Sequence, residues 1–501
     1  MNQLKAGVVL NYVIIILSAL VGLLYTPYML RMLGQSEYGL YSLVSSVVAY
    51  LTILDLGFGN ALLRYTAKYR AEGKVKEQSE MFGMFLVLYS VIGVIAFIAG
   101  SVLFLNIDSL FGATMTVEEL GKAKILMLIM VFNVAITFPL SIWGSIISAY
   151  EHFVFPKLVN IVRILLNTGL MIALLSRGYK AIAMVIVQTA FNIVTPVIYY
   201  IYCKKVLSIK VKFGKFQWGF LKEVAIYSFW IFLNIIMDRI YWSTGQFVLG
   251  IVSGTVAISV FAVAIQLQSM YMQFSSAISS VFLPKVTGMV ATNKSDDDIS
   301  DLFIRTGRVQ NIVMMAILTE FIVFGKQFII LWAGEEYASA YPMTLMFFVG
   351  LYVPLIQSIG RTVLQARNQM EFRSIVYIIL AVISLVMQFI LAKHLGGIGC
   401  ALAISGTLLL GHGLCMNIYY YKVQKLDTIT FWKEIMNMNI FPIAICFLSC
   451  LSLRFFEVDS WLKLIIGICI YLIVYIPIIF CFSMNSSERK LFTSFLNRKN
   501  A

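Results

Sequence analysis

Residues 8–29 read VVLNYVIIILSALVGLLYTPYM, and this stretch decides the fold class. From Val13 to Leu17 the side chains are apolar without a break, whereas a strand of a membrane barrel alternates apolar and polar residues. A run of about twenty apolar residues is long enough to cross the hydrocarbon core of a bilayer as an α-helix. Because lipid offers the backbone no hydrogen-bond partners, the segment has to satisfy its own N–H and C=O groups. It therefore predicts a transmembrane helix.

Similar apolar runs recur along the whole chain. Of the 501 residues 60% are hydrophobic and 12% are charged, and a water-soluble protein of this size would need a larger polar surface. We therefore expect an all-α polytopic membrane protein with about fourteen transmembrane helices. The expected spans are 8–29, 40–61, 81–105, 125–147, 158–175, 181–202, 224–241, 257–282, 312–331, 343–364, 375–391, 398–421, 435–453 and 461–482.

The basic residues indicate the orientation of these spans. The formal net charge is +14, and most of the 38 lysines and arginines fall in alternate loops, of which the lysine-rich stretch 204–222 is one. Because cytoplasmic loops hold the excess of such residues, this distribution predicts that both termini are cytoplasmic. The basic residues lie between apolar spans and not in a patch interleaved with aromatic residues, so no nucleic-acid partner is expected.

The sequence also repeats itself weakly at a shift of about 217 residues. AYEHFVF at 149–155 aligns with ARNQMEF at 366–372, and Arg177-Gly178 falls near Leu395-Gly396. An even number of spans separates the two copies, so both have the same orientation, as in parallel transporter repeats. We expect a six-helix lobe at 1–203, a cytoplasmic linker at 204–222 and a second six-helix lobe at 223–422. Two additional transmembrane helices and a cytoplasmic tail would occupy 423–501.

Polar side chains within the spans are the candidates for substrate binding. Lys157, Asn160, Arg163 and Asn167 follow one another at spacings of three, three and four residues, which places them on one face of a helix. Small polar residues also hold helices together in a bundle, but a guanidinium inside a span needs water, an anion or a carboxylate. Arg163 therefore favours a cavity. The other candidates for this role are Gln266, Gln273, Asn234, Asp238 and Arg361.

Three further residues are candidates for coupling or gating. Asp55 precedes the break Gly57-Phe58-Gly59-Asn60, where it either pairs with Arg64 or contacts the cargo or an ion. Glu320 stands alone among apolar residues, as a proton-carrying group or as the acceptor of a hydrogen bond between helices.

Several chemistries have no motif in the chain. No G-x-x-x-x-G-K-[ST] phosphate loop is present, and the acidic run 296–298 is interpreted as a solvated loop or the start of a helix. The seven cysteines lie in or beside apolar spans without paired spacing, and the three histidines are scattered. We expect no cofactor, no metal site and no catalytic residues.

A resemblance to a known family lies near the beginning of the chain. MLGQSEYGLYSL at 32–43, followed by LDLGFGNA at 54–61, resembles the first two helices of bacterial polysaccharide flippases. These are the Wzx-type O-antigen and capsule exporters of the multidrug/oligosaccharidyl-lipid/polysaccharide superfamily, whose fold is MATE-like. The resemblance implies a multi-pass protein of the bacterial inner membrane that moves an undecaprenyl-diphosphate-linked oligosaccharide by alternating access. It also implies contact with membrane lipids and with the polymerase and other proteins of polysaccharide assembly.

Other functions stay open at this level. A flippase for lipid II or a teichoic-acid precursor differs mainly in the attached sugar or polymer. A cation-coupled multidrug exporter would carry a cationic amphiphile, against which the basic face at 157–167 argues. An O-antigen polymerase or ligase would need an extended outer loop with catalytic residues, and the longest expected outer loop runs only from about 106 to 124.

Overall fold

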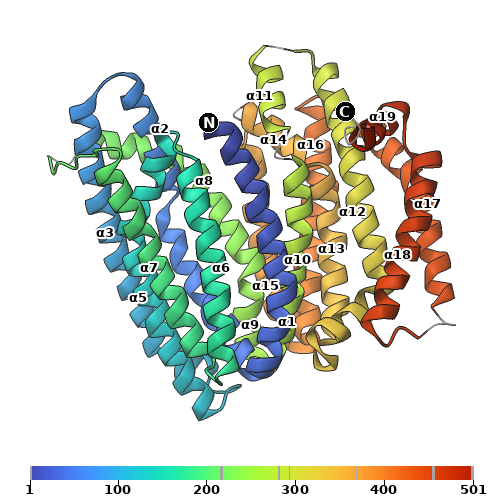
Figure 1. Cartoon of the computed structure of the whole chain (residues 1–501), viewed down its shortest axis with the longest axis horizontal. Coiled ribbons are helices and arrows are strands. Elements are labelled where there is room, and N and C mark those ends of the chain that lie inside the picture. The colour runs from blue at the N-terminus through green and yellow to red at the C-terminus, as the bar shows by residue number, and fades with distance from the viewer. Residues whose placement is uncertain are drawn as a thin grey trace. The chain divides into compact units, whose positions relative to one another are not determined.

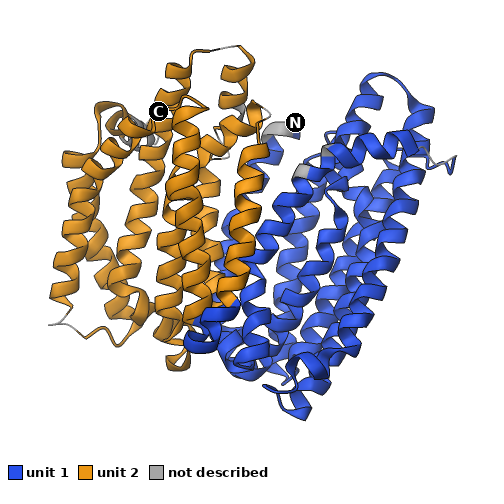
Figure 2. Cartoon of the chain, turned by 180° about the vertical axis from the view of Figure 1, so that it is seen from behind, with its two compact units in different colours: residues 1–262, 389–397 blue, residues 263–388, 398–501 orange. Residues whose placement is uncertain are grey.

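The computed structural model describes residues 3–214, 218–279, 282–292, 294–367, 369–453 and 457–497. Over these residues the chain is built from helices joined by short connections, without a strand (Figure 1). The expected all-α polytopic class is confirmed. Contacts divide the chain into two compact units, residues 1–262 with 389–397 and residues 263–388 with 398–501 (Figure 2).

Unit 1 contains the helices of the first half of the chain. They are α1 (Gln3–Leu51), the short 3-10 helix η1 (Thr52–Asp55), α2 (Phe58–Ala71), α3 (Val75–Leu105), α4 (Ile107–Phe111), α5 (Val117–Ala149), α6 (Val154–Ser176), α7 (Ala181–Lys205), α8 (Trp218–Trp242) and α9 (Thr244–Val252). The helix α10 (Thr255–Ser279) begins in unit 1 and continues in unit 2.

Unit 2 contains most of the remaining helices. They are α11 (Leu283–Ala291), α12 (Asp296–Ala333), η2 (Glu335–Tyr337), α13 (Ala340–Ile356), α14 (Ser358–Ala366), α15 (Glu371–Leu408), the π-helix η3 (Leu409–Met416), α16 (Asn417–Lys422), α17 (Thr428–Ser452), α18 (Trp461–Ile478), the π-helix η4 (Ile479–Ser483) and α19 (Ser486–Asn497). Residues 389–397 of α15 belong to unit 1.

The helices are long and apolar enough for a membrane. Among the described residues ten pass this test, and two bent pairs, Trp218–Ile226 with Ile231–Val252 and Ala340–Ile356 with Ser358–Ala366, raise the number to as many as 12. Two of the ten, Ala6–Ala71 with 66 residues and Glu371–Lys422 with 52, are more than twice as long as one crossing of the roughly 30 Å core requires. The expected count of fourteen needs two crossings from each of them, and it stays a prediction.

Glycines interrupt both of these long segments. Gly34 in α1 has φ 77° and ψ 169°, and Gly396 in α15 has φ 55° and ψ −133°. A residue with a Cβ adopts such angles only with strain, whereas glycine adopts them freely. Gly178, which the sequence repeat pairs with Gly396, also has a positive φ of 83°. Both glycines therefore have a positive φ, and the repeat itself stays a prediction.

The domain boundaries drawn from the repeat stay a prediction. They separate residues 1–203 from 223–422, whereas the compact units divide at residue 262 and exchange residues 389–397. Residues 215–217 of the expected linker and 498–501 of the expected tail lie outside the described residues.

Each unit has an aromatic core and an apolar exterior. In unit 1 Phe82, Phe85 and Tyr89 of α3 pack with Phe138 and Trp143 of α5, all of them buried. In unit 2 a second cluster joins α12, α17 and α18. Large apolar side chains also cover the outside, as Leu24 at 74% and Ile473 at 70% exposure show. In water such a surface would drive aggregation, and in a bilayer it is the surface that contacts lipid.

Candidate functional site

The structure places the predicted basic face on α6 in unit 1. Lys157, Asn160, Arg163 and Asn167 are all half-buried there, as expected for side chains on the side of the helix that packs against α1 and α7. An i, i+3, i+6, i+10 spacing keeps them on one side of a helix, and Val154–Ser176 is continuous.

Arg163 is held by uncharged amides. Its Nη2 donates to Oδ1 of Asn192 on α7 at 2.5 Å, and Nδ2 of Asn192 donates to Oδ1 of Asn133 on α5 at 3.2 Å. Thr137 Oγ1 donates to the same oxygen of Asn133 at 3.2 Å. No carboxylate of a described residue lies within 4.0 Å of the guanidinium, so its positive charge is not compensated by an ion pair.

Lys157, the first residue of the basic face, is likewise held by an uncharged amide. Its Nζ donates to Oδ1 of Asn11 on α1 at 2.6 Å, and again no ion pair with a described carboxylate is formed. On the same helix Oδ1 of Asn167 is buried and accepts no hydrogen bond, so it has an open position for a donor. Two cations held by neutral groups make this face attractive to an anion.

Sequence reasoning missed the residues that hold the two cations. Asn11, Asn133 and Asn192 lie on three other helices, and only the fold brings them to α6. The available signal was weak, because each is a lone amide inside an apolar span. Tyr41 and Gln188 form a further polar pair in this unit, with the tyrosine hydroxyl donating to Oε1 at 3.1 Å.

The other candidates of unit 1 lie elsewhere on its helices. Asp55 in η1 accepts a hydrogen bond from the hydroxyl of Tyr89 on α3 at 2.8 Å. Arg64 is exposed on α2, with its guanidinium carbon 5.9 Å from the ring centre of Tyr65. On α8 Asn234 is half-buried and Asp238 is exposed.

The remaining candidates belong to unit 2. Gln266 and Gln273 are half-buried on α10, whereas Gln268, two residues after Gln266 and on a different face of that helix, is buried. Arg361 is exposed on α14. Gln266 and Gln273 are thus half-buried, as are the four residues of the basic face of α6.

Glu320 on α12 borders a small cavity of about 180 Å³. The walls are apolar and aromatic, with Tyr271, Phe321, Phe324 and Phe348 among them. The Oε1 atom of Glu320 is buried and has no hydrogen-bond partner. The sequence left two interpretations of Glu320 open, a proton-carrying group and the acceptor of a hydrogen bond between helices. This oxygen does not accept such a hydrogen bond.

A larger apolar cavity of about 450 Å³ lies in unit 2 between α12, α17 and α18. Phe324, Leu453, Ile466, Ile470 and Val474 are among its lining residues, and Glu457 and Lys463 also border it. The lining suits an apolar chain with a polar group at one end.

Comparisons with known proteins give the family and the fold. Residues 4–290, more than half of the chain, match the family described as "Polysaccharide biosynthesis protein". The "Uncharacterized membrane protein EpsK" of Bacillus subtilis (strain 168) is 20% identical over 469 residues, which cover 91% of this chain and 90% of that protein.

Two solved structures share the fold at low sequence identity. A "Lipid II flippase MurJ, inward closed conformation" superposes with a TM-score of 0.71 and 18% identity over 98% of this chain and 99% of that chain. A multidrug resistance MATE family transporter of the MOP superfamily in an inward-facing conformation gives 0.62 and 16%, over 82% and 99%. The MATE-like architecture expected from the sequence is thereby confirmed.

Proposed function

The chain belongs to the polysaccharide biosynthesis protein family, and we propose that it translocates an undecaprenyl-diphosphate-linked oligosaccharide across the bacterial inner membrane by alternating access. The cargo would be an O-antigen or capsule repeat unit. The MurJ-like and MATE-like fold and the helices long and apolar enough to cross a membrane support a transporter.

The observation that carries this proposal is the pair of uncompensated cations on α6. Arg163 and Lys157 have amide partners instead of carboxylates. A diphosphate group carries negative charge and several acceptor oxygens, so it supplies what the two side chains lack. In this proposal Asn160 and Asn167 on the same face bind sugar hydroxyls. A cationic amphiphile, the cargo of a multidrug exporter, would be repelled by this face.

The outer end of unit 1 supports a gate. Glu119 on α5 accepts hydrogen bonds from Ser36 at 2.5 Å and from Thr255 at 2.8 Å, and so links α1 to the beginning of α10. A Cβ at Gly39 would overlap the carbonyl oxygen of Thr255. In this proposal the close contact of α1 with α10 is the closed state of the outer gate, on the side that the basic residues predict to be outside.

Coupling is proposed to involve the acidic candidates. Glu320, with an unpartnered buried oxygen in an apolar cavity, is the group that we propose binds and releases a proton during the cycle. Asp55 and Arg64 keep the gating role proposed for them, in which movement of η1 and α2 changes the contact between Asp55 and Tyr89.

The test is complementation of a strain that lacks the gene. The wild-type chain should restore extracellular polysaccharide, and its absence should leave lipid-linked oligosaccharide on the cytoplasmic face of the membrane. Loss of lipid II or a teichoic-acid precursor from the outer face, with normal polysaccharide, would instead assign the chain to that cargo. Normal polysaccharide and normal precursors in the deletion strain would exclude all of these cargoes.

A further inference from the structure

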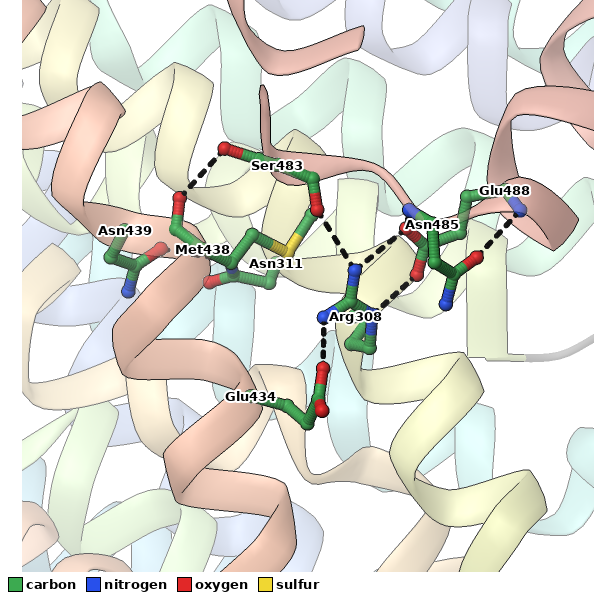
Figure 3. Close-up of polar contacts among 8 residues, drawn as sticks. All are labelled: Arg308, Asn311, Glu434, Met438, Asn439, Ser483, Asn485 and Glu488. Atoms are coloured by element: carbon green, nitrogen blue, oxygen red, sulfur yellow. Dashed lines mark hydrogen bonds and ion pairs between the residues drawn. The ribbon is translucent and has the colours of Figure 1, made fainter. Parts of the chain in front are cut away.

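Arg308 on α12 makes four hydrogen bonds within unit 2, two of them to one carboxylate (Figure 3). Its side chain is only 6% exposed. Nε donates to Oε1 of Glu488 at 2.6 Å and Nη2 donates to Oε2 at 2.9 Å, so the carboxylate is held by two parallel hydrogen bonds. Nη1 donates to Glu434 on α17 at 2.5 Å, and Nη2 also donates to the carbonyl oxygen of Ser483 at 2.9 Å.

Glu488 belongs to α19, the helix at the C-terminal end of the described chain. Its Oε2 also accepts from the backbone N–H of Asn485 at 2.9 Å, while Oδ1 of Asn485 accepts from the N–H of Glu488 at 2.9 Å. These reciprocal bonds are a capping box, which fixes the first turn of a helix. The same carboxylate therefore starts α19 and ties it to α12.

The cluster also ties the helices α17 and α18 to α12. Ser483, at the end of η4 that follows α18, donates through Oγ to the carbonyl oxygen of Met438 on α17 at 3.1 Å (Figure 3). One turn along α12 from Arg308, Asn311 donates to Asn439 of α17 at 2.8 Å. Toward their other ends α12, α17 and α18 enclose the apolar cavity of about 450 Å³. The polar contacts thus fasten these helices at one end.

We propose that α19 is a strap that keeps α17 and α18 docked on α12, and that release of Glu488 from Arg308 undocks the end of α17 that carries Glu434 and Met438. The inference does not depend on what the protein transports.

The physical reason lies in the burial of the cluster. While α19 covers Arg308, its bonds to Glu434 and Ser483 are shielded from water and are strong. Without Glu488 the guanidinium loses its two-bond partner, and water reaches it from the side that α19 had covered. The remaining pair with Glu434, whose side chain is already 45% exposed, then becomes a surface ion pair of little strength.

Thiols at three positions can distinguish undocking of one end of α17, movement of the whole of α17, and global unfolding. Met438 is 2% exposed and lies at the strapped end of α17, so Met438→Cys places a thiol at the point of interest. Cys446, 7% exposed and farther along α17, reports on the other half of that helix. Cys203 is fully buried in unit 1 and reports on global unfolding. Maleimide labelling of the purified full chain, followed by peptide mass spectrometry, measures all three rates in one sample.

In Glu488→Ala we expect the labelling rate of the introduced thiol at 438 to rise about a hundredfold, the change expected when one partner of a buried ion pair is removed. The rate at Cys203 should not change. Lys490→Ala is the matched control, because Lys490 is an exposed charge on the same helix, and it should label as the parent does. Glu488→Gln, which keeps the shape of the side chain, should give a smaller rise and covers the case in which Glu488→Ala does not accumulate.

Two results would overturn the proposal. Unchanged labelling at 438 in both Glu488 variants would show that α19 does not hold α17. A parallel rise at 438 and at Cys203 would show that the substitution unfolds the chain as a whole, and not that a strap has been released.

Discussion

Replacement of Arg163 tests the anion-binding role of α6. One of the five N–H donors of an arginine is occupied by Asn192, which leaves the fork available to a phosphate group. A hydrogen bond to a charged group contributes about 1.5–3 kcal/mol, and each 1.4 kcal/mol is about tenfold in affinity. Arg163→Ala should therefore weaken binding of a diphosphate cargo by about ten- to a hundredfold or more. Arg163→Lys keeps the charge but not the planar fork, and the expected loss is about tenfold.

The assay is binding of a short-chain polyprenyl-diphosphate sugar to the purified full chain. Surface polysaccharide and the amount of protein in the membrane are measured in cells that express the same variants. Arg177→Ala is the matched control, because Arg177 is an exposed arginine that directly follows α6. Arg163→Ala should lower both binding and polysaccharide without lowering the amount of protein. Unchanged affinity and normal polysaccharide in Arg163→Ala would remove this residue from the mechanism and would refute the electrostatic reasoning.

Three further predictions concern the gate, the proposed coupling site and a helix cap. Gly39→Val, whose side chain overlaps the carbonyl oxygen of Thr255, should hold the outer end open, which faster thiol labelling at outer positions of α1 would show, and should slow transport; wild-type labelling and transport would exclude this contact from the gate. Glu320→Gln should abolish the pH dependence of transport while cargo binding is retained, and a variant that keeps the wild-type pH profile would exclude Glu320 from coupling. Asp427→Ala should lower the free energy of unfolding by about 1 kcal/mol, because the carboxylate of Asp427 caps α17 by accepting a hydrogen bond from the N–H of Thr430. Hydrogen bonds from Thr430 also lower the pKa of the Asp427 carboxyl. A carboxyl with a lowered pKa stabilises the folded state above its ordinary pKa of about 3.9. The difference in stability between the wild type and Asp427→Ala should therefore be present at neutral pH and disappear as the pH falls through the lowered pKa. Melting curves recorded in detergent at several pH values measure it.

Local pattern was sufficient to predict the fold class. Apolar runs such as 8–29 satisfy the length and hydrophobicity of a crossing without reference to the rest of the chain, so the helices were predictable one by one. The basic face of α6 was predictable for the same reason, because the spacing from Lys157 to Asn167 depends only on helical geometry.

Contacts between distant helices were not predictable. Periodicity shows which face of a helix is polar, but not that Asn192 and Asn133 lie against Arg163. It also does not show that Gln268, and not Gln266 or Gln273, is the buried amide of α10, because the neighbours of the helix decide which face is buried.

The burial and the ion pairs of Arg308 were not predictable from the sequence either. From the sequence alone, basic residues beside the spans are predicted to be loop charges that indicate orientation. In the structure Arg308 is buried, because Glu434 and Glu488 approach it from segments more than a hundred positions later in the chain. No spacing rule connects residues that far apart, so only the folded chain reveals the cluster.

The most direct test of the proposed function is transbilayer movement of the lipid-linked cargo in proteoliposomes. Purified protein is reconstituted with a fluorescent undecaprenyl-diphosphate oligosaccharide, and the fraction of label that reaches the other leaflet is followed with a membrane-impermeant quencher. We expect rapid movement with the wild-type chain and with Arg177→Ala, and movement close to that of empty vesicles with Arg163→Ala. Equal rates in empty vesicles and in vesicles that contain the wild-type protein would contradict the proposed function.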